Sequence, residues 1–195
     1  RIRPDMGNYE AIKLLRSGNQ SPVRLTFNNI RLKSDLVHKV GTKFEFDSLQ
    51  FARMLDSDSV TRFYGFTPAT ILAMFIPNTY EVFWTTPAEK LMGRMKSEYD
   101  KFWTPERREK ARRLDLTPVE VSVLASIVEA ETKSQPEKPR VAGVYLNRLR
   151  LNMPLQADPT VIYAIGDFGI RRLLRSQMFF DSPYNTYVHT GLPPG

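Results

Sequence analysis

Residues 117–132, TPVEVSVLASIVEAET, are the stretch that decides the fold. Thr117 is a good N-cap, Pro118 stands at the first helical position, and Glu120 completes a capping box, so a helix is predicted to begin here. When the residues that follow are projected onto a helix, they are apolar on most sides. We therefore predict that this helix is central and packs against neighbours in several directions.

The first candidate functional group is the carboxylate of Glu129, near the end of this helix. Its sector of the helix carries the small residues Ser122, Ala125 and Ser126, which leave room for a ligand, whereas Glu131 falls on a different face. An ionisable group buried in apolar surroundings must be paired, neutral or used in chemistry. The alternative is that the chain reaches water at this helix end and Glu129 is simply solvated.

Composition restricts the class of protein. The chain has 195 residues, 42% hydrophobic and 25% charged, as expected for an ordinary globular protein of one large or two small domains. The net charge of +7 suggests anionic surroundings such as a polymer, nucleic acid or membrane surface. The lack of cysteine excludes disulfides and thiolate chemistry, and the wide separation of His38 and His189 argues against a histidine-rich metal site.

The first part of the chain is predicted to form a small α+β unit. Helices are expected at residues 9–17, at residues 32–40 and after the N-cap Asp47, and a half-buried strand at residues 23–27, where apolar and polar residues alternate. This unit ends near residue 72. Its pattern suits a compact carbohydrate-binding module, and it suits many other small α+β domains equally well.

The remainder is predicted to be mainly helical. Residues 75–84, FIPNTYEVFW, are typical of a strand, and helices are expected from Pro87, from Pro105, over residues 117–132, after Pro136 and Pro139, and over residues 159–165, with Asp158-Pro159 as cap and Gly166 as the end. The last 25 residues are predicted to be loop-like. We interpret the basic run from Arg107 to Arg113 as a solvated helix face. No run of about 18 apolar residues is present, so the sequence as given predicts a soluble chain.

Polar and aromatic side chains of the kind that line sugar-binding grooves follow in the second half. Amides recognise hydroxyl and acetamido groups, and aromatic faces stack on sugar rings. The residues are Tyr163, Tyr184 and Tyr187 with Asn147, Gln156 and Asn185. Taken singly, each is more often a packing or turn residue. No phosphate-binding loop, dinucleotide fingerprint, nucleophile elbow, zincin motif or calcium loop is present in the sequence.

Three separated segments, in the right order, resemble the catalytic domain of the endolytic murein (lytic) transglycosylases, the MltG or YceG-like family. They are LASIVEAET (124–132), VAGVYLNRLRLNMPLQADPTVIYAIG (141–166) and YNTYVHTGLPPG (184–195). Upstream, FIPNTYEVFW resembles the family's Pro-Asp-Thr-Tyr segment, with Asn78 where the family usually has an acid. The resemblance implies an α+β protein with a LysM-like module over residues 1–72 and a mainly helical catalytic domain over residues 73–195, incomplete at its C-terminus.

The function that this resemblance implies is cleavage of the β-1,4 bond between N-acetylmuramic acid and N-acetylglucosamine in peptidoglycan. No water enters this reaction, which leaves a 1,6-anhydromuramoyl end and is expected to act within nascent glycan strands. The family's catalytic glutamate falls on Glu129 as a single general acid/base, and the apolar helix end is expected to raise its pKa. Substrate-groove or support roles fall on Asn147, Gln156, Asp158, Tyr184, Asn185 and Tyr187. No metal and no cofactor are expected.

The resemblance also implies a place in the bacterial cell envelope. A membrane anchor is expected upstream of Arg1, with the catalytic domain facing the cell wall. Peptidoglycan strands are the expected partner, and cell-wall synthesis proteins are further candidates.

Two other classes of protein stay open. The first is a non-catalytic glycan-binding or scaffold protein whose Glu129 is structural, and release of soluble anhydro-products discriminates against it. The second is a nucleic-acid-binding module, suggested by the net charge and the 22 aromatic residues (2 Trp, 8 Tyr and 12 Phe). The densest basic cluster lies on one helix without interleaved aromatics, so nucleic acid is not an expected partner.

Overall fold

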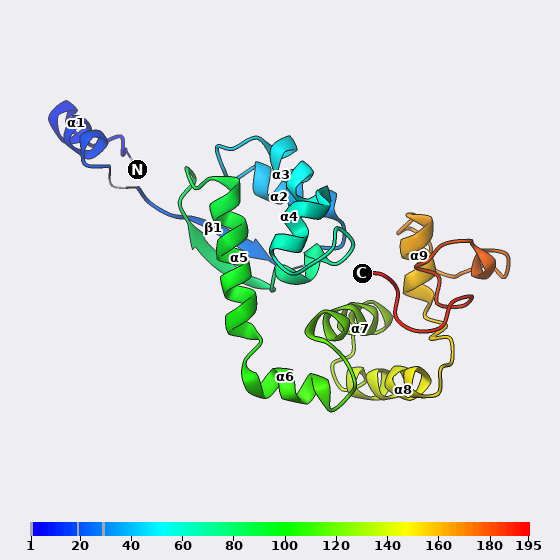
Figure 1. Cartoon of the computed structure of the whole chain (residues 1–195). Coiled ribbons are helices and arrows are strands. Elements are labelled where there is room, and N and C mark those ends of the chain that lie inside the picture. Colours follow the sequence, from blue (N-terminus) through cyan, green and yellow to red (C-terminus); the bar gives the residue numbers. More distant parts are fainter. Residues whose placement is uncertain (1, 19, 29) are drawn as a thin grey trace. The chain divides into compact units, whose positions relative to one another are not determined.

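The computed structural model describes residues 2–18, 20–28 and 30–195. It combines helices with a small sheet, which confirms the predicted α+β class (Figure 1). In chain order the elements are α1 (Asn8–Arg16), β1 (Val23–Phe27), α2 (Lys33–Gly41), α3 (Ser48–Asp56), α4 (Asp58–Phe63), the 3₁₀ turn η1 (Ile71–Met74), β2 (Asn78–Val82), α5 (Ala88–Phe102), α6 (Pro105–Arg112), α7 (Pro118–Glu131), α8 (Lys138–Arg150), α9 (Asp158–Ile165) and the 3₁₀ turn η2 (Gln177–Phe179).

The chain separates into two compact units. The first contains the residues up to Pro68 together with Phe75–Tyr99, and the second contains Ala69–Met74 together with Asp100–Gly195. Within the described ranges, no helix has both the length and the apolar character needed to cross a lipid bilayer.

The first unit is built on the antiparallel pair β1 and β2. Leu25 stands opposite Tyr80 in the register, and both side chains are buried together with Phe27. The ring of Phe27 meets Phe75 edge-on with 5.5 Å between ring centroids, so strand pairing and aromatic packing hold the same region together. The strand predicted at residues 75–84 is present but shorter, because Phe75 packs into the core ahead of the paired residues.

Helices α2 and α3 contribute to the core of the first unit, as do the fully buried Leu91, Met92 and Met95 of α5. The carboxylate of Asp47 accepts a hydrogen bond of 2.9 Å from the backbone N–H of Leu49, which confirms the predicted N-cap of α3. The fully buried side chains of the two helices are Leu36, Val40, Phe51 and Leu55. That residues 1–72 make up a LysM-like module stays a prediction.

Helix α7 organises the second unit. The backbone N–H of Glu120 donates to Thr117 Oγ1 at 3.2 Å and the Thr117 N–H donates to Glu120 Oε2 at 2.7 Å, so the predicted capping box is confirmed. One face of the helix is buried against α8 and the segment that leads into α9. The core residues are Val123, Leu124, Ile127, Val128, Tyr145, Leu155 and Ala157. The opposite face, with Ala125 and Ser126, is exposed.

Helices α8 and α9 follow α7 in the same unit (Figure 1). Gly166 ends α9 with a φ of 79°, as the sequence predicts. The predicted capping role of Asp158 is wrong, because Ala157 holds the N-cap position and Asp158 lies in the first turn, where its carboxylate binds another residue. After α9 the described chain is loop-like apart from η2 and a single bridge between Pro154 and Thr190.

The basic helix α6 belongs to this unit as well. The lysine and arginine side chains of this run are exposed, and several pair with nearby acids: Lys110 with Glu106, Arg112 and Arg113 with Glu109, and Arg108 with Asp100 of α5. The interpretation of this run as a solvated face is confirmed.

Candidate active site

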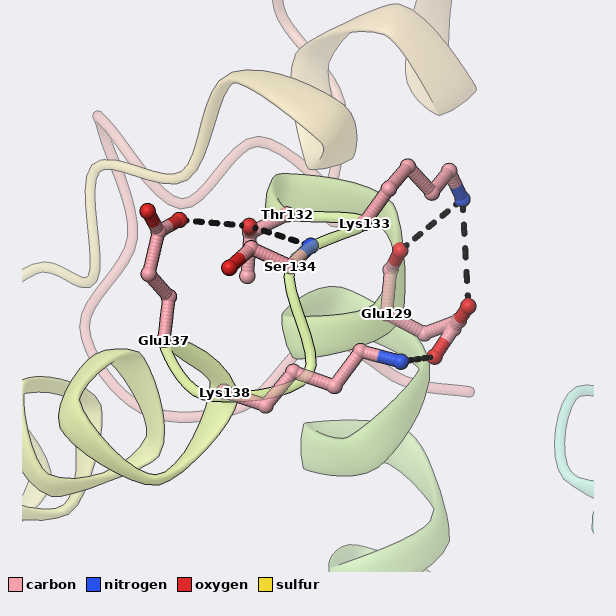
Figure 2. A network of polar contacts seen from close by, with 6 residues as sticks. All are labelled: Glu129, Thr132, Lys133, Ser134, Glu137 and Lys138. Carbon is pink, nitrogen blue, oxygen red and sulfur yellow. Dashed lines mark hydrogen bonds and ion pairs between the residues drawn. The ribbon is translucent and has the colours of Figure 1, made fainter.

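Glu129 lies in the last turn of α7 with 59% of its side chain exposed. Its Oε2 accepts a hydrogen bond from Nζ of Lys138, and its Oε1 lies 3.9 Å from Nζ of Lys133. Lys133 also donates to the backbone carbonyl of Glu129 at 3.0 Å. Figure 2 shows the two lysines reaching the glutamate from different directions. The carboxylate is therefore accessible to solvent but held by two cations.

The pKa of Glu129 is lowered from its ordinary value. The hydrogen bond from Lys138 is the largest cause, followed by partial desolvation, which opposes it, and then by the charges of Lys138 and Lys133. The prediction of a raised pKa is wrong for this structure, because the exposed small side of α7 leaves the carboxylate at the surface, within reach of Lys138. In this state it is a proton acceptor, and it must gain a proton before it can donate one.

The loop between α7 and α8 is held by its own polar side chains (Figure 2). The hydroxyl of Thr132 donates to Glu137 Oε2 at 2.8 Å and accepts a hydrogen bond of 3.1 Å from the backbone N–H of Ser134. Lys138 follows directly as the first residue of α8, and only 19% of its side chain is exposed. The loop thus fixes the start of α8 close to the end of α7.

A second polar cluster lies on another face of α7, around Glu131. Tyr145 on α8 is buried, and its pKa is raised by burial and then by its interaction with Glu131. The hydroxyl of Tyr187 donates to Asp158 Oδ1 at 2.5 Å. Burial, this bond and the charges of Asp158 and Glu131 raise the pKa of Tyr187 to about 12. The cluster therefore joins α7, α8, α9 and the C-terminal segment.

Gln156, between α8 and α9, has an unusual backbone conformation. Its φ is 54°, in the left-handed region that residues other than glycine rarely adopt. Its backbone N–H donates to the carbonyl of Thr186 at 2.9 Å, and its side-chain Oε1 accepts a hydrogen bond of 3.2 Å from Arg148. The side chain is exposed, so the surrounding contacts hold a strained residue at the surface, a feature often found at functional sites.

Asn185 lies beneath this surface and has no exposed area. Its side-chain N–H groups donate to the carbonyls of Met178 at 3.1 Å and Phe180 at 2.8 Å, and its Oδ1 accepts from the Tyr187 N–H at 2.9 Å. All the polar atoms of this amide are engaged within the chain. Of the two roles expected for Asn185, groove or support, its position fits support of the loop.

Tyr184 and Asn147 lie apart from these contacts. The ring of Tyr184 is half-buried, with its centroid 5.0 Å from that of Tyr163 on α9. Asn147 is exposed on α8 and accepts a hydrogen bond of 2.9 Å from Arg150. Among the predicted groove residues, the structure joins Asp158 to Tyr187 and Tyr187 to the buried Asn185, while Gln156 bonds to Thr186 and Arg148. Whether any of these residues binds substrate stays a prediction.

Sequence reasoning did not single out several residues that the structure places here. They are Lys133 and Lys138 beside Glu129, Arg148 beside Gln156, and the buried pair Thr160 and Thr186, whose hydroxyls lie 2.8 Å apart. The four-residue spacing of Glu129 and Lys133 could have predicted their contact, because residues four apart meet along one side of a helix. Lys138 reaches Glu129 across a loop, which no periodic pattern indicates.

Comparison with known proteins gives the chain a family. The YceG-like family model matches residues 1–195. Over 72 residues, 37% of the chain, it is 47% identical to the endolytic murein transglycosylase of Bacillus subtilis (strain 168). Over 123 residues, 61% of the chain, it is 35% identical to the endolytic murein transglycosylase of Streptococcus pneumoniae serotype 2 (strain D39 / NCTC 7466).

The matches span 20% and 22% of the length of these two curated relatives. Among solved structures, a crystal structure of a YceG-like protein from Listeria monocytogenes is similar over the whole chain, with a TM-score of 0.74 and 25% sequence identity. The similarity covers 69% of that protein's chain. The family model, the relatives and the fold agree, and the chain belongs to the YceG-like family.

Proposed function

We propose that the second unit carries a lytic transglycosylase site that cleaves the β-1,4 bond between N-acetylmuramic acid and N-acetylglucosamine, with Glu129 as the single general acid/base. Family membership and the names of the two relatives support the reaction class. The observation that carries the proposal is the exposed carboxylate of Glu129. It lies at the end of α7, a helix whose opposite face is buried in the core of the unit.

In the proposed reaction the protonated Glu129 carboxyl donates its proton to the glycosidic oxygen. The bond between C1 of the muramoyl residue and that oxygen breaks, and the C6 hydroxyl of the same sugar forms the new bond to C1. The Glu129 carboxylate then accepts the C6 proton, so the acid is regenerated and no water is consumed. Most glycosidases need a second carboxylate as nucleophile or base, but here the sugar's own hydroxyl takes that place.

The remaining predicted site residues divide by exposure. Gln156 is exposed, and it is proposed to contact the sugar directly together with the half-buried Tyr184 and the exposed Asn147. Asp158 and Tyr187 are proposed to shape the groove through their mutual hydrogen bond, and Asn185 is proposed to support them from below. The substrate places the protein at the cell wall in this proposal.

The test is mass spectrometry of purified peptidoglycan after incubation with the chain and with two variants, Glu129→Gln and Glu131→Gln. We expect anhydromuramoyl products from the parent chain and a loss of at least about 10²–10⁴-fold in Glu129→Gln, the usual contribution of general acid–base catalysis. Glu131→Gln should lose much less, because Glu131 lies on a different face of α7 and is not the proposed acid. Equal losses in the two variants would contradict the assignment of Glu129.

One observation favours a second candidate function. The ion pair of Glu129 with Lys138 is also what a structural glutamate would show, as in a glycan-binding or scaffold protein. A pelleting assay with insoluble peptidoglycan separates the two functions. Equal binding by the parent chain and Glu129→Gln, with no soluble anhydro-product from either, would favour the binding protein.

A further inference from the structure

The ion pair between Glu129 and Lys138 joins two charges that each stand at the unfavourable end of a helix. Glu129 lies in the last turn of α7, where the helix dipole presents partial negative charge, and Lys138 is the first residue of α8, where it presents partial positive charge. Each charge alone is disfavoured at its position. Their hydrogen-bonded contact offsets both costs, which explains why the two side chains meet.

The two lysines beside Glu129 differ in how firmly they are placed. The side chain of Lys133 is 78% exposed, and its ammonium lies 3.9 Å from Oε1 of Glu129, beyond hydrogen-bond distance. The side chain of Lys138 is 19% exposed, so its aliphatic stem is packed and its ammonium has little freedom. The bonds among Thr132, Ser134 and Glu137 hold the preceding loop (Figure 2). Lys138 is therefore the cation that is built into the site.

We propose that Lys138 is a positioning residue, whose ammonium holds the Glu129 carboxylate in place at the end of α7. The charged groups that face the carboxylate are Lys138 from α8 and Lys133 from the loop. The catalytic consequence rests on the proposed function of Glu129 as general acid. Lys138 stabilises the ionised form of the resting carboxylate. When Glu129 takes up a proton, the ion pair with Lys138 must separate, or one carboxyl oxygen must keep the contact with Lys138 while the other holds the proton.

The sign of the effect follows from the charge. A cation that stabilises the carboxylate lowers the pH at which Glu129 is protonated, so an acid-dependent reaction loses activity at a lower pH than it would without Lys138. Removal of the Lys138 charge should therefore raise the titration midpoint of Glu129. It should also move the alkaline limb of the kcat/KM profile to higher pH.

The charge effect is tested without reference to activity by ¹³C NMR titration of the side-chain carboxyl carbon of Glu129, assigned with Glu129→Gln. We expect a midpoint below the ordinary glutamate value in the parent chain, an upward shift in Lys138→Met, and little change in Lys138→Arg. Lys133→Met should shift the midpoint less, because its ammonium is not in hydrogen-bond contact. Lys138→Gln, which keeps a polar end, serves if the methionine variant does not fold.

A midpoint at or above the ordinary value in the parent chain would overturn the proposal, as would an unchanged midpoint in the folded neutral variants. The catalytic role has its own readout in the pH dependence of anhydromuramoyl product release. If the NMR midpoint of Glu129 rises in Lys138→Met but the alkaline limb of the kcat/KM profile does not move, the role of Lys138 in catalysis is overturned. If neither the parent chain nor any variant forms product, the proposed function fails. The NMR midpoints then still decide whether Lys138 lowers the pH at which Glu129 is protonated.

Discussion

The hydroxyl of Tyr187 donates a 2.5 Å hydrogen bond to Oδ1 of Asp158 and joins the C-terminal segment to the first turn of α9. The acceptor is a carboxylate, so the bond is charge-assisted and stronger than one between neutral groups. Asp158 is also well placed at a helix N-terminus, where negative charge is favourable. Through this contact, the C-terminal segment and the start of α9, which are distant in sequence, form one polar site.

Tyr187→Phe should lower the free energy of unfolding by about 1–2 kcal/mol, because it removes a hydrogen bond to a charged group and leaves the ring in place. Urea denaturation followed by circular dichroism measures the change. Asp158→Asn is the matched control, since the amide oxygen still accepts the tyrosine hydroxyl, and it should cost less. If both variants were as stable as the parent chain, the bond would contribute nothing to folding.

Burial of the Tyr187 hydroxyl, together with its bond to Asp158, gives stability a dependence on alkaline pH. The folded-state pKa of Tyr187 is raised to about 12 from an ordinary value of 10.0. A group with a raised folded pKa stabilises fully below its unfolded pKa and loses this contribution as pH rises through the folded pKa. The stability difference between the parent chain and Tyr187→Phe should stay constant up to about pH 10 and shrink between about pH 10 and 12. A difference that grows over this range would have the wrong sign.

Asn185→Ala should be strongly destabilising. The substitution removes the buried side-chain partner of the Met178 and Phe180 carbonyls and of the Tyr187 N–H, at up to about 1–3 kcal/mol for each group that stays unsatisfied. We expect a total loss of about 2–4 kcal/mol, after local relaxation, in thermal unfolding. Asn147→Ala is the exposed control and should change stability by no more than about 0.5 kcal/mol. Similar losses in the two variants would contradict a special role for the buried amide.

Substitutions of Gln156 can separate an effect on stability from an effect on ligand binding. Glycine adopts a φ of 54° freely, so Gln156→Gly should be more stable than Gln156→Ala by about 0.5–1 kcal/mol. Both variants lose the side chain and should bind peptidoglycan equally weakly in the pelleting assay. Weaker binding by the alanine variant alone would indicate that the backbone, and not the amide side chain, matters for the ligand.

Much of the local structure could be predicted because its causes lie within a few residues. The capping box of α7 involves Thr117 and Glu120, and Gly166 ends α9 through its own backbone conformation. The alternation in residues 23–27 predicts a strand with one buried face, and Leu25 and Phe27 are buried. The position of Glu129 on the small-residue side of its helix follows from the same periodicity, which carries no information about what lies opposite that side.

The sequence by itself determined the positions of these helices and strands, the separation of Glu129 and Glu131 onto different faces, and the resemblance to the YceG-like family. Only the tertiary structure decided that β1 pairs with β2, that Lys138 binds Glu129 and lowers its pKa, and that Asp158 binds Tyr187 while Asn185 is buried beneath them. The physical reason is the separation along the sequence between the residues that interact. Helix caps and periodic faces depend on near neighbours, whereas the protonation of a carboxylate depends on which distant side chains the folded chain places beside it.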